Sequence, residues 1–280
     1  MSDGIEIRKT YKLFINGAFP RSESGRTESV HGPDGRLLAH VAKASRKDLR
    51  DAVRAARAAQ SGWAGRTAYN RGQIIYRLAE MLEGRRGELT HELTRTGVDG
   101  SVADQDVAGA IDAAVYWAGF ADKLDILAGS VNPVAGPFLN VSATVPPGVC
   151  GLVAPARLEA LVSMTSAAIM AGNTTVVLAG GDVILAAGTL GELVATSDVP
   201  PGVVNILTGI PADLHGWLAD HEDVDLLDLS GVPDETRRDL ETRAAENLKR
   251  VSATGGARDL STALAFTEIR TVWHPARIAP

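Results

Sequence analysis

The sequence predicts an α/β protein built on a doubly wound parallel sheet. In the middle of the chain, continuous apolar stretches of strand length alternate with helical segments, which is typical of parallel strands buried on both faces. Right-handed crossovers between these strands would place helices on both faces of the sheet. The predicted strands span residues 149–154, 174–178, 203–207, 224–229 and 248–251, and the intervening helices span residues 158–170, 183–196, 211–219 and 234–247.

The N-terminal part of the chain predicts turns followed by amphipathic helices. Asn16-Gly17 is a strong two-residue turn signal, and residues 31–35 form a second turn. Ser45 is a candidate N-cap for a helix that continues to Trp63. A second helix is expected after Asn70, and a third, longer helix is expected over residues 102–127. Because each helix has one apolar stripe, these helices are expected to cover other elements.

Two further segments have no place in the alternating series. Residues 138–145 are extended and have turn-forming residues on both sides. The tail, residues 265–273, follows a Gly255-Gly256 linker and alternates in polarity as a strand does. A strand needs a partner for its backbone groups, so the tail must pair with another strand.

Composition and charge narrow the class of protein. The chain has 280 residues and a net charge of −6, without the concentrated basic face expected of a nucleic-acid binder. The arginines in residues 46–95 are interleaved with acidic residues, which predicts salt-bridged helix faces. Cys150 is the sole cysteine, so an intrachain disulfide and a four-cysteine zinc site are excluded.

The sequence also suggests a location in the cell. Residues 1–12 lack the apolar stretch of a signal peptide, and no apolar run approaches the roughly 20 residues that span a bilayer. We therefore expect a cytoplasmic protein with neither a membrane nor a nucleic acid among its partners.

Several segments together resemble one family, the NAD(P)-dependent aldehyde dehydrogenases. They occur in the family's order over about residues 11–251, and a last segment resembles the family's C-terminal strand. The segments are LFING at 13–17, GPDG at 32–35, AVRAARAA at 52–59 with Trp63, YWAGFADK at 116–123, PGVCGLVAP at 147–155, AGNT at 171–174, PPGVVNILTG at 200–209, HEDVD at 221–225 and FTEIRTVW at 266–273.

The resemblance implies a domain organisation. It assigns residues 1–128 and 146–252 to a Rossmann-like nucleotide-binding domain. It assigns residues 129–145 and 257–280 to a protruding β arm that pairs with neighbouring subunits. Full-length relatives are much longer, and the part without a counterpart here is their catalytic domain.

The residues that the family uses for chemistry are replaced, so we expect no catalytic residue in this chain. The family's nucleophilic thiol comes from the missing domain, and Cys150 lies in an apolar strand, where a buried core residue is expected. In place of the family's Leu-Glu-Leu-Gly-Gly, which carries the general base, stand residues 252–256 with Ala253 at the glutamate position. The oxyanion-donating asparagine is replaced by Arg157, and losing one such donor typically lowers the rate roughly 10²–10³-fold.

The cofactor site is altered as well, so no cofactor is expected, or only weakly bound NAD or NADP. The family's ribose-binding lysine has no counterpart in residues 175–182, where Asp182 is expected to act as a helix N-cap instead. The segment 231–234 could present backbone N–H groups to a phosphate, but Pro233 removes one donor and the next residue adds a negative charge. The residues expected to keep a vestigial cofactor role are Val153, Pro155 and Gly231.

Two histidines and two nearby acids are candidate metal ligands. His215 and His221 flank a predicted helix near Asp223 and Asp225, but their spacing matches no standard ligand motif. We therefore expect no metal site and interpret these residues as solvated helix ends. His274 follows Trp273 in the tail, which indicates an interface pair.

These observations favour a catalytically inactive pseudoenzyme of the family. It would be a structural or regulatory subunit that assembles with itself or with an active aldehyde dehydrogenase. The alternative is an NAD(P)-binding protein or a residual oxidoreductase of the same family. A decaying gene product would fold poorly, and the intact strand and helix pattern argues against it. The expected interface residues are Phe138, Asn140, Phe266, Ile269, Val272 and Trp273.

Overall fold

The computed structural model describes residues 9–276. Residues 1–8, on which part of the signal-peptide expectation rests, and residues 277–280, the end of the expected arm, lie outside the described residues. Within residues 9–276, no helix combines the length and apolar character needed to cross a bilayer.

A five-stranded parallel sheet forms the centre of the protein, as the sequence predicts. Its strand order is β10-β9-β6-β7-β8, so the order reverses next to β6. The strand bounds differ from the expected ones by a few residues at most. The strands are β6 (Val149–Val153), β7 (Thr174–Ala179), β8 (Val204–Thr208), β9 (Leu226–Asp228) and β10 (Arg250–Ser252).

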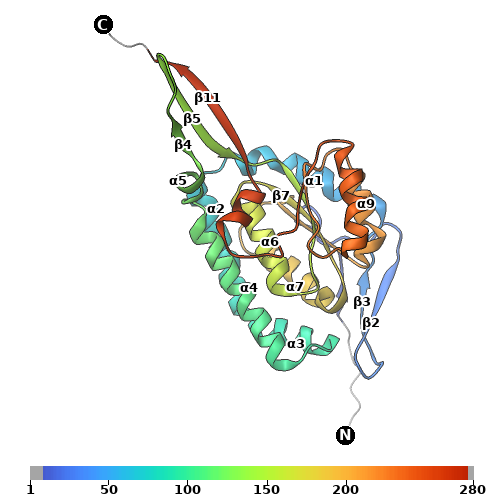
Figure 1. The fold of residues 1–280 in the computed structure, drawn as a ribbon. Coiled ribbons are helices and arrows are strands. Elements are labelled where there is room, and N and C mark those ends of the chain that lie inside the picture. Colours follow the sequence, from blue (N-terminus) through green and yellow to red (C-terminus); the bar gives the residue numbers. More distant parts are fainter. Residues whose placement is uncertain (1–8, 277–280) are drawn as a thin grey trace.

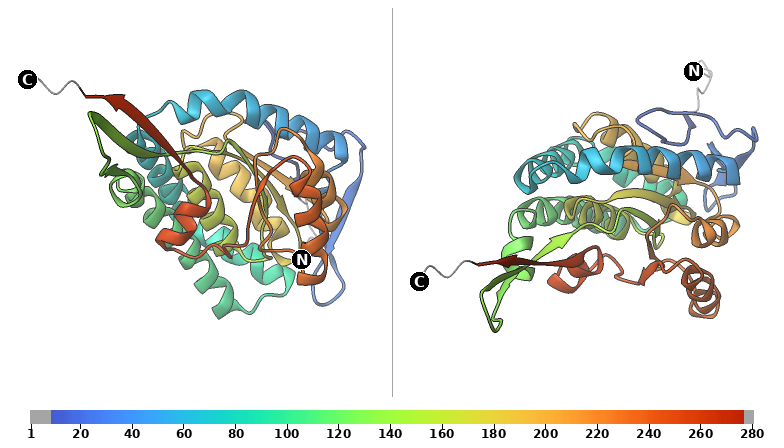
Figure 2. Two further views of the ribbon diagram at one scale, coloured as in Figure 1. Left: turned by 45° about the horizontal axis from the view of Figure 1, so that its top comes forward. Right: turned by 90° about the horizontal axis from the view of Figure 1, so that it is seen from above.

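Alternating side chains of the sheet build two cores, which confirms the doubly wound arrangement. Along β6, Cys150 and Leu152 face one core, whereas Val149 and Val153 face the other. The helices α6 and α7 cover the first face, and α1 and α8 cover the second (Figure 2). Their bounds are α1 (Arg46–Ala64), α6 (Leu158–Met170), α7 (Ile184–Ala195) and α8 (His215–Asp220), with α9 (Asp234–Ala245) beside β10.

Two predicted local signals of the N-terminal region are confirmed. Asn16 and Gly17 both have positive φ, at 53° and 73°, which is the conformation of a tight two-residue turn. Ser45 caps α1, because its side chain accepts a hydrogen bond from the Asp48 amide while the Asp48 carboxylate accepts one from the Ser45 amide. A small sheet of order β1-β3-β2 consists of β1 (Thr10–Tyr11), β3 (Leu37–Ala42) and β2 (Thr27–His31).

The helices that follow differ from prediction in three ways. The second helix begins at Ala68 and not after Asn70, and Thr67 caps it, since its hydroxyl accepts from the Asn70 amide. A short helix over residues 86–96 was not predicted from the sequence, because its surface is mostly polar and its apolar stripe is narrow. The long helix expected over residues 102–127 is broken by a turn after Phe120. The observed helices are α2 (Ala68–Gly84), α3 (Arg86–Thr96), α4 (Gly100–Phe120) and α5 (Leu124–Ala128).

The charged faces of these helices form ion pairs, as the interleaved charges predict. Arg77 pairs with Glu80 at 2.7 Å, and Arg86 pairs with Glu83 at 2.8 Å. Arg77 and Glu80 lie three positions apart on one helix, whereas the pair of Glu83 and Arg86 joins the end of one helix to the start of the next. Such exposed pairs contribute little to stability, so they mainly keep the helix surface soluble.

The two segments left over by the sequence analysis pair with each other in an arm that projects from the body (Figure 1). The tail strand runs antiparallel to the strand of residues 138–145, and a third short strand completes a sheet of order β11-β5-β4. A short helix that the sequence analysis did not expect precedes the tail strand. The elements are β4 (Ser130–Asn132), β5 (Phe138–Val145), α10 (Leu260–Ala265) and β11 (Glu268–Pro275).

A buried carboxylate joins β1 to the helical layer. Glu92 on α3 is 2% exposed and accepts hydrogen bonds from the hydroxyls of Tyr11, at 2.6 Å, and Thr189, at 2.8 Å. No residue of the described range 9–276 donates to its second oxygen, and Lys9 lies 3.8 Å from the bonded oxygen. Burial raises the pKa of Glu92, and the bonds from Tyr11 and Thr189 offset this only in part.

Glu92→Gln should change how stability depends on pH. Because the folded-state pKa of Glu92 is raised above its ordinary value of 4.5, its contribution to stability is full below that value and is lost as pH rises through the folded-state pKa. The variant lacks this loss. Its free energy of unfolding in urea should therefore gain on the parent protein as pH rises from about 4 to 8.

Glu88→Gln provides the matched control on the same helix. The hydrogen bond from Arg85 lowers the pKa of Glu88, so its contribution is present above the ordinary pKa and is lost as pH falls. The two variants should therefore show pH trends of opposite sign. Parallel trends would contradict the assignment of Glu92.

Candidate functional site

The carboxyl ends of β6 and β9 are the place to seek a ligand site. In open α/β sheets, ligands bind at the carboxyl edge where the strand order reverses, and here β6 lies between β7 and β9. The structure brings the three predicted cofactor residues, Val153, Pro155 and Gly231, together at this edge. They meet in direct contact, however, and none of them lines any of the five surface cavities described among residues 9–276.

Gly231 closes the gap between the two strand ends. Its amide donates a 2.7 Å hydrogen bond to the Val153 carbonyl oxygen. A side chain at Gly231 would collide with the Ala154 carbonyl and would stand 2.9 Å from the Pro155 nitrogen. The segment after β9 therefore packs on the end of β6 with backbone against backbone.

A buried carboxylate fixes the segment that follows β10 onto the same edge. Asp228, at the end of β9, is fully buried. One of its oxygens accepts from the amide and hydroxyl of Ser230, and the other accepts from the Ser252 hydroxyl and from the amide and hydroxyl of Thr254. This carboxylate therefore joins the end of β9 to residues 252–254, where the resemblance places the family's general base.

The N-terminus of α6 is capped from another helix. Arg157 occupies the N-cap position and provides no side-chain cap. Instead, the buried Asp106 of α4 accepts from the amides of Leu158, at 2.8 Å, and Glu159, at 3.1 Å. Helix N-termini attract anions through free N–H groups, and an internal carboxylate already satisfies this one.

The position expected for the oxyanion donor carries an ion-pair network. Arg157 pairs with Glu159 at 2.6 Å and lies 3.6 Å from Asp106. Arg258, from the segment after β10, reaches Glu159 at 3.5 Å. These charges neutralise one another across the sheet edge, so the guanidinium of Arg157 is held by carboxylates of the same chain.

The start of α9 offers a poor phosphate site. Pro233 is its N-cap and has no N–H group, and Asp234 and Glu235 place negative charge in the first turn. Arg237 pairs with Asp234 at 3.2 Å and also donates to the Val232 carbonyl. The charge at this helix start therefore opposes an anionic ligand.

The segment after β7 differs from one expectation. Asp182 does not cap a helix, because it lies inside a short 3₁₀ turn, Gly181–Val183, that runs directly into α7 without a side-chain cap. The backbone carbonyl of Asp182 accepts from the Thr96 hydroxyl at 2.8 Å. A lysine is absent from residues 175–182, so this segment has no cation for a ribose or phosphate group.

The only thiol is confined to the core, as predicted. Cys150 is fully buried in β6, near the opposite end of the strand from Pro155. Burial raises the pKa of this thiol well above its ordinary value. Cys150 is therefore protonated at neutral pH and cannot meet a substrate at the carboxyl edge.

His221, Asp223 and Asp225, three of the four residues considered as metal ligands, make contacts within the chain. Asp225 receives the Arg57 guanidinium at 2.6 Å and the Val149 amide at 2.7 Å, whereas His221 accepts the Asp223 amide at 3.2 Å. Burial lowers the pKa of both His215 and His221. Among residues 9–276, no group of three or more metal-binding side chains converges.

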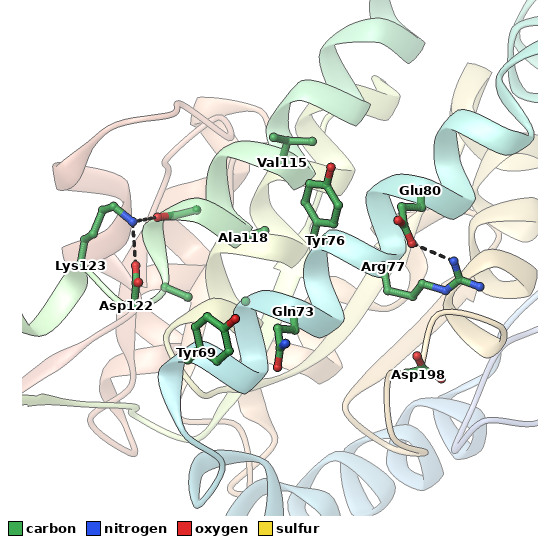
Figure 3. Close-up of a pocket in the computed structure, with 13 residues that line it drawn as sticks. Tyr69, Gln73, Tyr76, Arg77, Glu80, Val115, Ala118, Asp122, Lys123 and Asp198 are labelled. Carbon is green, nitrogen blue, oxygen red and sulfur yellow. Dashed lines mark hydrogen bonds and ion pairs between the residues drawn. The ribbon is translucent and has the colours of Figure 1, made fainter.

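A surface cavity away from the sheet edge was not predicted from the sequence. It is a groove of about 620 Å³ between α2 and α4. Tyr69 and Tyr76 of α2 are more than half exposed along it, and Val115 of α4 lies opposite (Figure 3). The charged groups that line it are the pairs Lys123–Asp122 and Arg77–Glu80 together with Asp198, and they do not form the arrangement of nucleophile and base that catalysis needs.

The predicted interface residues divide into two groups. Phe138, Ile269, Val272 and Trp273 are between 41% and 56% exposed on the arm. Asn140 and Phe266 correct the prediction, because they are buried within the chain itself. Asn140 is 2% exposed and accepts a hydrogen bond from Asn132. Phe266 is completely buried in the main core, so its side chain does not reach the surface.

Sequence comparison identifies relatives of one kind. The pattern of the aldehyde dehydrogenase family matches residues 19–273. The chain is 36% identical over 263 residues to cytosolic aldehyde dehydrogenase 1 of Elephantulus edwardii, covering 91% of this chain and 52% of the relative. It is 34% identical to retinal dehydrogenase 2 of Gallus gallus, covering 91% of this chain and 50% of that protein. The chain thus spans about half the length of these curated relatives.

Solved structures of the same kind share the fold. An NAD+ complex of aldehyde dehydrogenase from Bacillus cereus superposes with a TM-score of 0.81 at 28% identity, covering 87% of this chain and 50% of that chain. An NAD-dependent aldehyde dehydrogenase from Sinorhizobium meliloti gives a TM-score of 0.80 at 25% identity, covering 88% of this chain and 50% of that chain. The likeness therefore extends over most of the described fold.

Removing the buried carboxylate should destabilise the protein. Asp228→Ala leaves the donors of Ser230, Ser252 and Thr254 without their acceptor, and unsatisfied buried groups of this kind cost about 2–4 kcal/mol in total. Urea unfolding would measure the change.

The control for this change is Asp234→Ala at the start of α9. The Asp234 side chain is 93% exposed and takes part in a surface ion pair, so its loss should alter the free energy of unfolding by less than about 0.5 kcal/mol. Equal effects of the two substitutions would contradict the structural role of Asp228.

Proposed function

Because the chain belongs to the aldehyde dehydrogenase family, we propose that it is a catalytically inactive member that serves as a structural or regulatory subunit. It assembles with itself or with an active aldehyde dehydrogenase. In this proposal, residues 1–128 and 146–252 form the nucleotide-binding-type domain, and residues 129–145 and 257–280 form the arm. A cytoplasmic location is part of the proposal and is supported by the relative named as cytosolic.

One observation carries the proposal of inactivity, namely the carboxyl edge closed by contacts of the chain with itself. Aldehyde oxidation through a covalent intermediate needs a nucleophile, a base and an oxyanion donor at one point. At this point the chain instead has Arg157 held by Glu159, and Asp228 held by Thr254. The segment 253–267 leads from β10 through α10 to the arm, without a further domain between them.

The same edge fits a dinucleotide poorly. A pyrophosphate needs free N–H groups and room at a helix start. Asp106 satisfies the amides at the start of α6, and Pro233 lacks an N–H group at the start of α9. Gly231 packs against the backbone of residues 154–155 without leaving a gap. We therefore derive no step through NAD or NADP.

The arm supports a role in assembly. Every residue of β11 is solvent-exposed in the isolated chain, including the large apolar side chains of Ile269, Val272 and Trp273. An exposed strand edge together with apolar side chains favours association with another strand. A subunit that has lost catalysis but retains this surface can still shape an oligomer.

The second candidate function is dinucleotide binding without aldehyde oxidation. It is favoured by the similarity to the Bacillus cereus enzyme solved as an NAD+ complex. Direct titration of the purified chain with NAD and with NADP distinguishes the two candidates, because the closed edge predicts dissociation constants weaker than about 1 mM.

Purified protein should produce no NADH or NADPH when mixed with aldehydes and either dinucleotide. Tagged full-length chain should purify as an oligomer or together with an active aldehyde dehydrogenase, identified by mass spectrometry. A protein that is monomeric and captures no relative would refute the subunit role. Dinucleotide reduction that disappears when a residue of this chain is altered would refute the inactivity.

A further inference from the structure

Two surface cavities lie side by side at the start of α1, where this helix and α8 cover the second face of the sheet. One has a volume of about 430 Å³ and the other of about 360 Å³, and both are lined by Arg46 and Trp217. Cavities of about 300–1,000 Å³ are typical of sites for small organic molecules. The two cavities together are named the Trp217 site.

Three segments of the chain converge on the Trp217 site. Lys43 follows β3 directly, and its amide donates to the Arg26 carbonyl at 3.1 Å, which brings these two basic residues to one edge of the small sheet. The chain then enters α1, in which Arg46 is the first residue after the Ser45 cap. Trp217 comes from α8, and the Arg46 guanidinium lies over its indole ring, 3.9 Å from the ring centroid.

Positive charge prevails at this site, although the chain as a whole has a net charge of −6. Five basic residues line the two cavities, against two acidic ones. Both acidic residues are already paired, Asp213 with Lys43 and Asp220 with Arg243. Carboxylates of the chain therefore neutralise only part of the positive charge.

Arg46 is held in place without using its hydrogen-bond donors. Stacking on the Trp217 ring is a cation–π contact that fixes the plane of the guanidinium. The N–H groups of a guanidinium lie in that plane, so stacking leaves them free to donate. Among residues 9–276, no carboxylate forms an ion pair with Arg46 or with Arg26. Both guanidinium groups are therefore available to an anion.

The larger of the two cavities adds an apolar wall beside these donors. Leu49 and the Trp217 ring contribute to this wall, and Trp217 is 42% exposed. Aromatic rings pack favourably against one another in offset or edge-on arrangements, so an exposed indole suits a flat apolar ligand. The site thus combines a surface for an aromatic body with donors for a negative group.

We propose that the Trp217 site binds a small organic anion that carries an aromatic body. The carboxylate or phosphate group of the ligand accepts hydrogen bonds from Arg46, and Arg26 contributes its charge. The aromatic body lies against Trp217 in the cavity of about 430 Å³. This inference goes beyond the proposed function, because neither the ends of β6 and β9 nor the arm line these cavities, and its failure leaves the subunit role untouched.

Calorimetric titration of the full chain with three naphthalene compounds tests the class of ligand. 2-Naphthoate and 2-naphthyl phosphate carry the negative group, whereas 2-naphthalenemethanol has the same body without a charge. At least one anion should bind with a dissociation constant of about 1 mM or tighter, and the alcohol should bind about tenfold more weakly or worse. The tighter of the two anions identifies the head group. Equal binding of anions and alcohol, or no binding of either anion, would overturn the proposal.

Fluorine NMR tests the location. The chain has four tryptophans, so labelling with 5-fluorotryptophan gives one signal for each, and Trp217→Phe identifies the signal of residue 217. The tighter-binding naphthalene anion should shift this signal and leave those of the buried Trp63 and Trp117 unchanged. If the anion binds while the Trp217 signal stays in place, the ligand lies elsewhere and the site is refuted.

Two substitutions on α1 test the part played by the guanidinium. Arg46→Gln should weaken binding of the same anion about tenfold or more, because a hydrogen bond between charged groups is lost. The matched control is Arg54→Gln, since Arg54 is exposed on the same helix and lines neither cavity, and its affinity should stay within about twofold of the parent. Both positions are exposed, so folding should be unaffected. Equal affinities of the two variants would contradict the role of Arg46.

Discussion

The closed carboxyl edge of the sheet depends on the hydrogen bonds that the Asp228 carboxylate accepts. It is fully buried, and it accepts hydrogen bonds from both the segment after β9 and the segment after β10. A buried charge is tolerated only when its oxygens are satisfied in this way. Because a buried Asp228 without these donors would be unfavourable, the hydrogen bonds hold the segments after β9 and β10 against the carboxyl edge of the sheet. In an open α/β sheet this edge would carry a crevice.

The other closures follow the same physical rule, that groups which could bind a ligand are satisfied within the chain. Asp106 occupies the amides of α6, Glu159 holds Arg157, and Gly231 allows the backbone segments to touch. The arm is the opposite case, because its outer strand leaves backbone groups and apolar side chains exposed. The unsatisfied groups therefore lie on the arm, where they favour association, and not at the sheet edge, where a reaction would take place. This distribution is the basis of the proposed subunit role.

Much of this fold could be predicted from the sequence, because apolar strands, turn residues and caps are local signals. The parallel sheet, the Asn16-Gly17 turn and the Ser45 cap are examples. The polar helix α3 and the short helix α10 escaped because their apolar stripes span few residues. At the site, the sequence showed that residues which the family uses for chemistry are replaced. It did not show that the carboxyl edge of the sheet is closed by contacts within the chain. The partners of Asp228 and Asp106 lie on other elements, and the burial of Phe266 depends on packing that a linear pattern does not encode.

Amide hydrogen exchange at the sheet edge tests the central claim most directly. The amides of Gly231 and Thr254 are bonded to Val153 and Asp228, so the account predicts that they exchange as slowly as those of the core strands. Saturating NAD or NADP should leave their rates unchanged. Rapid exchange at both amides, or strong added protection when a dinucleotide is present, would mean that the edge opens to form a working cleft and would contradict the account.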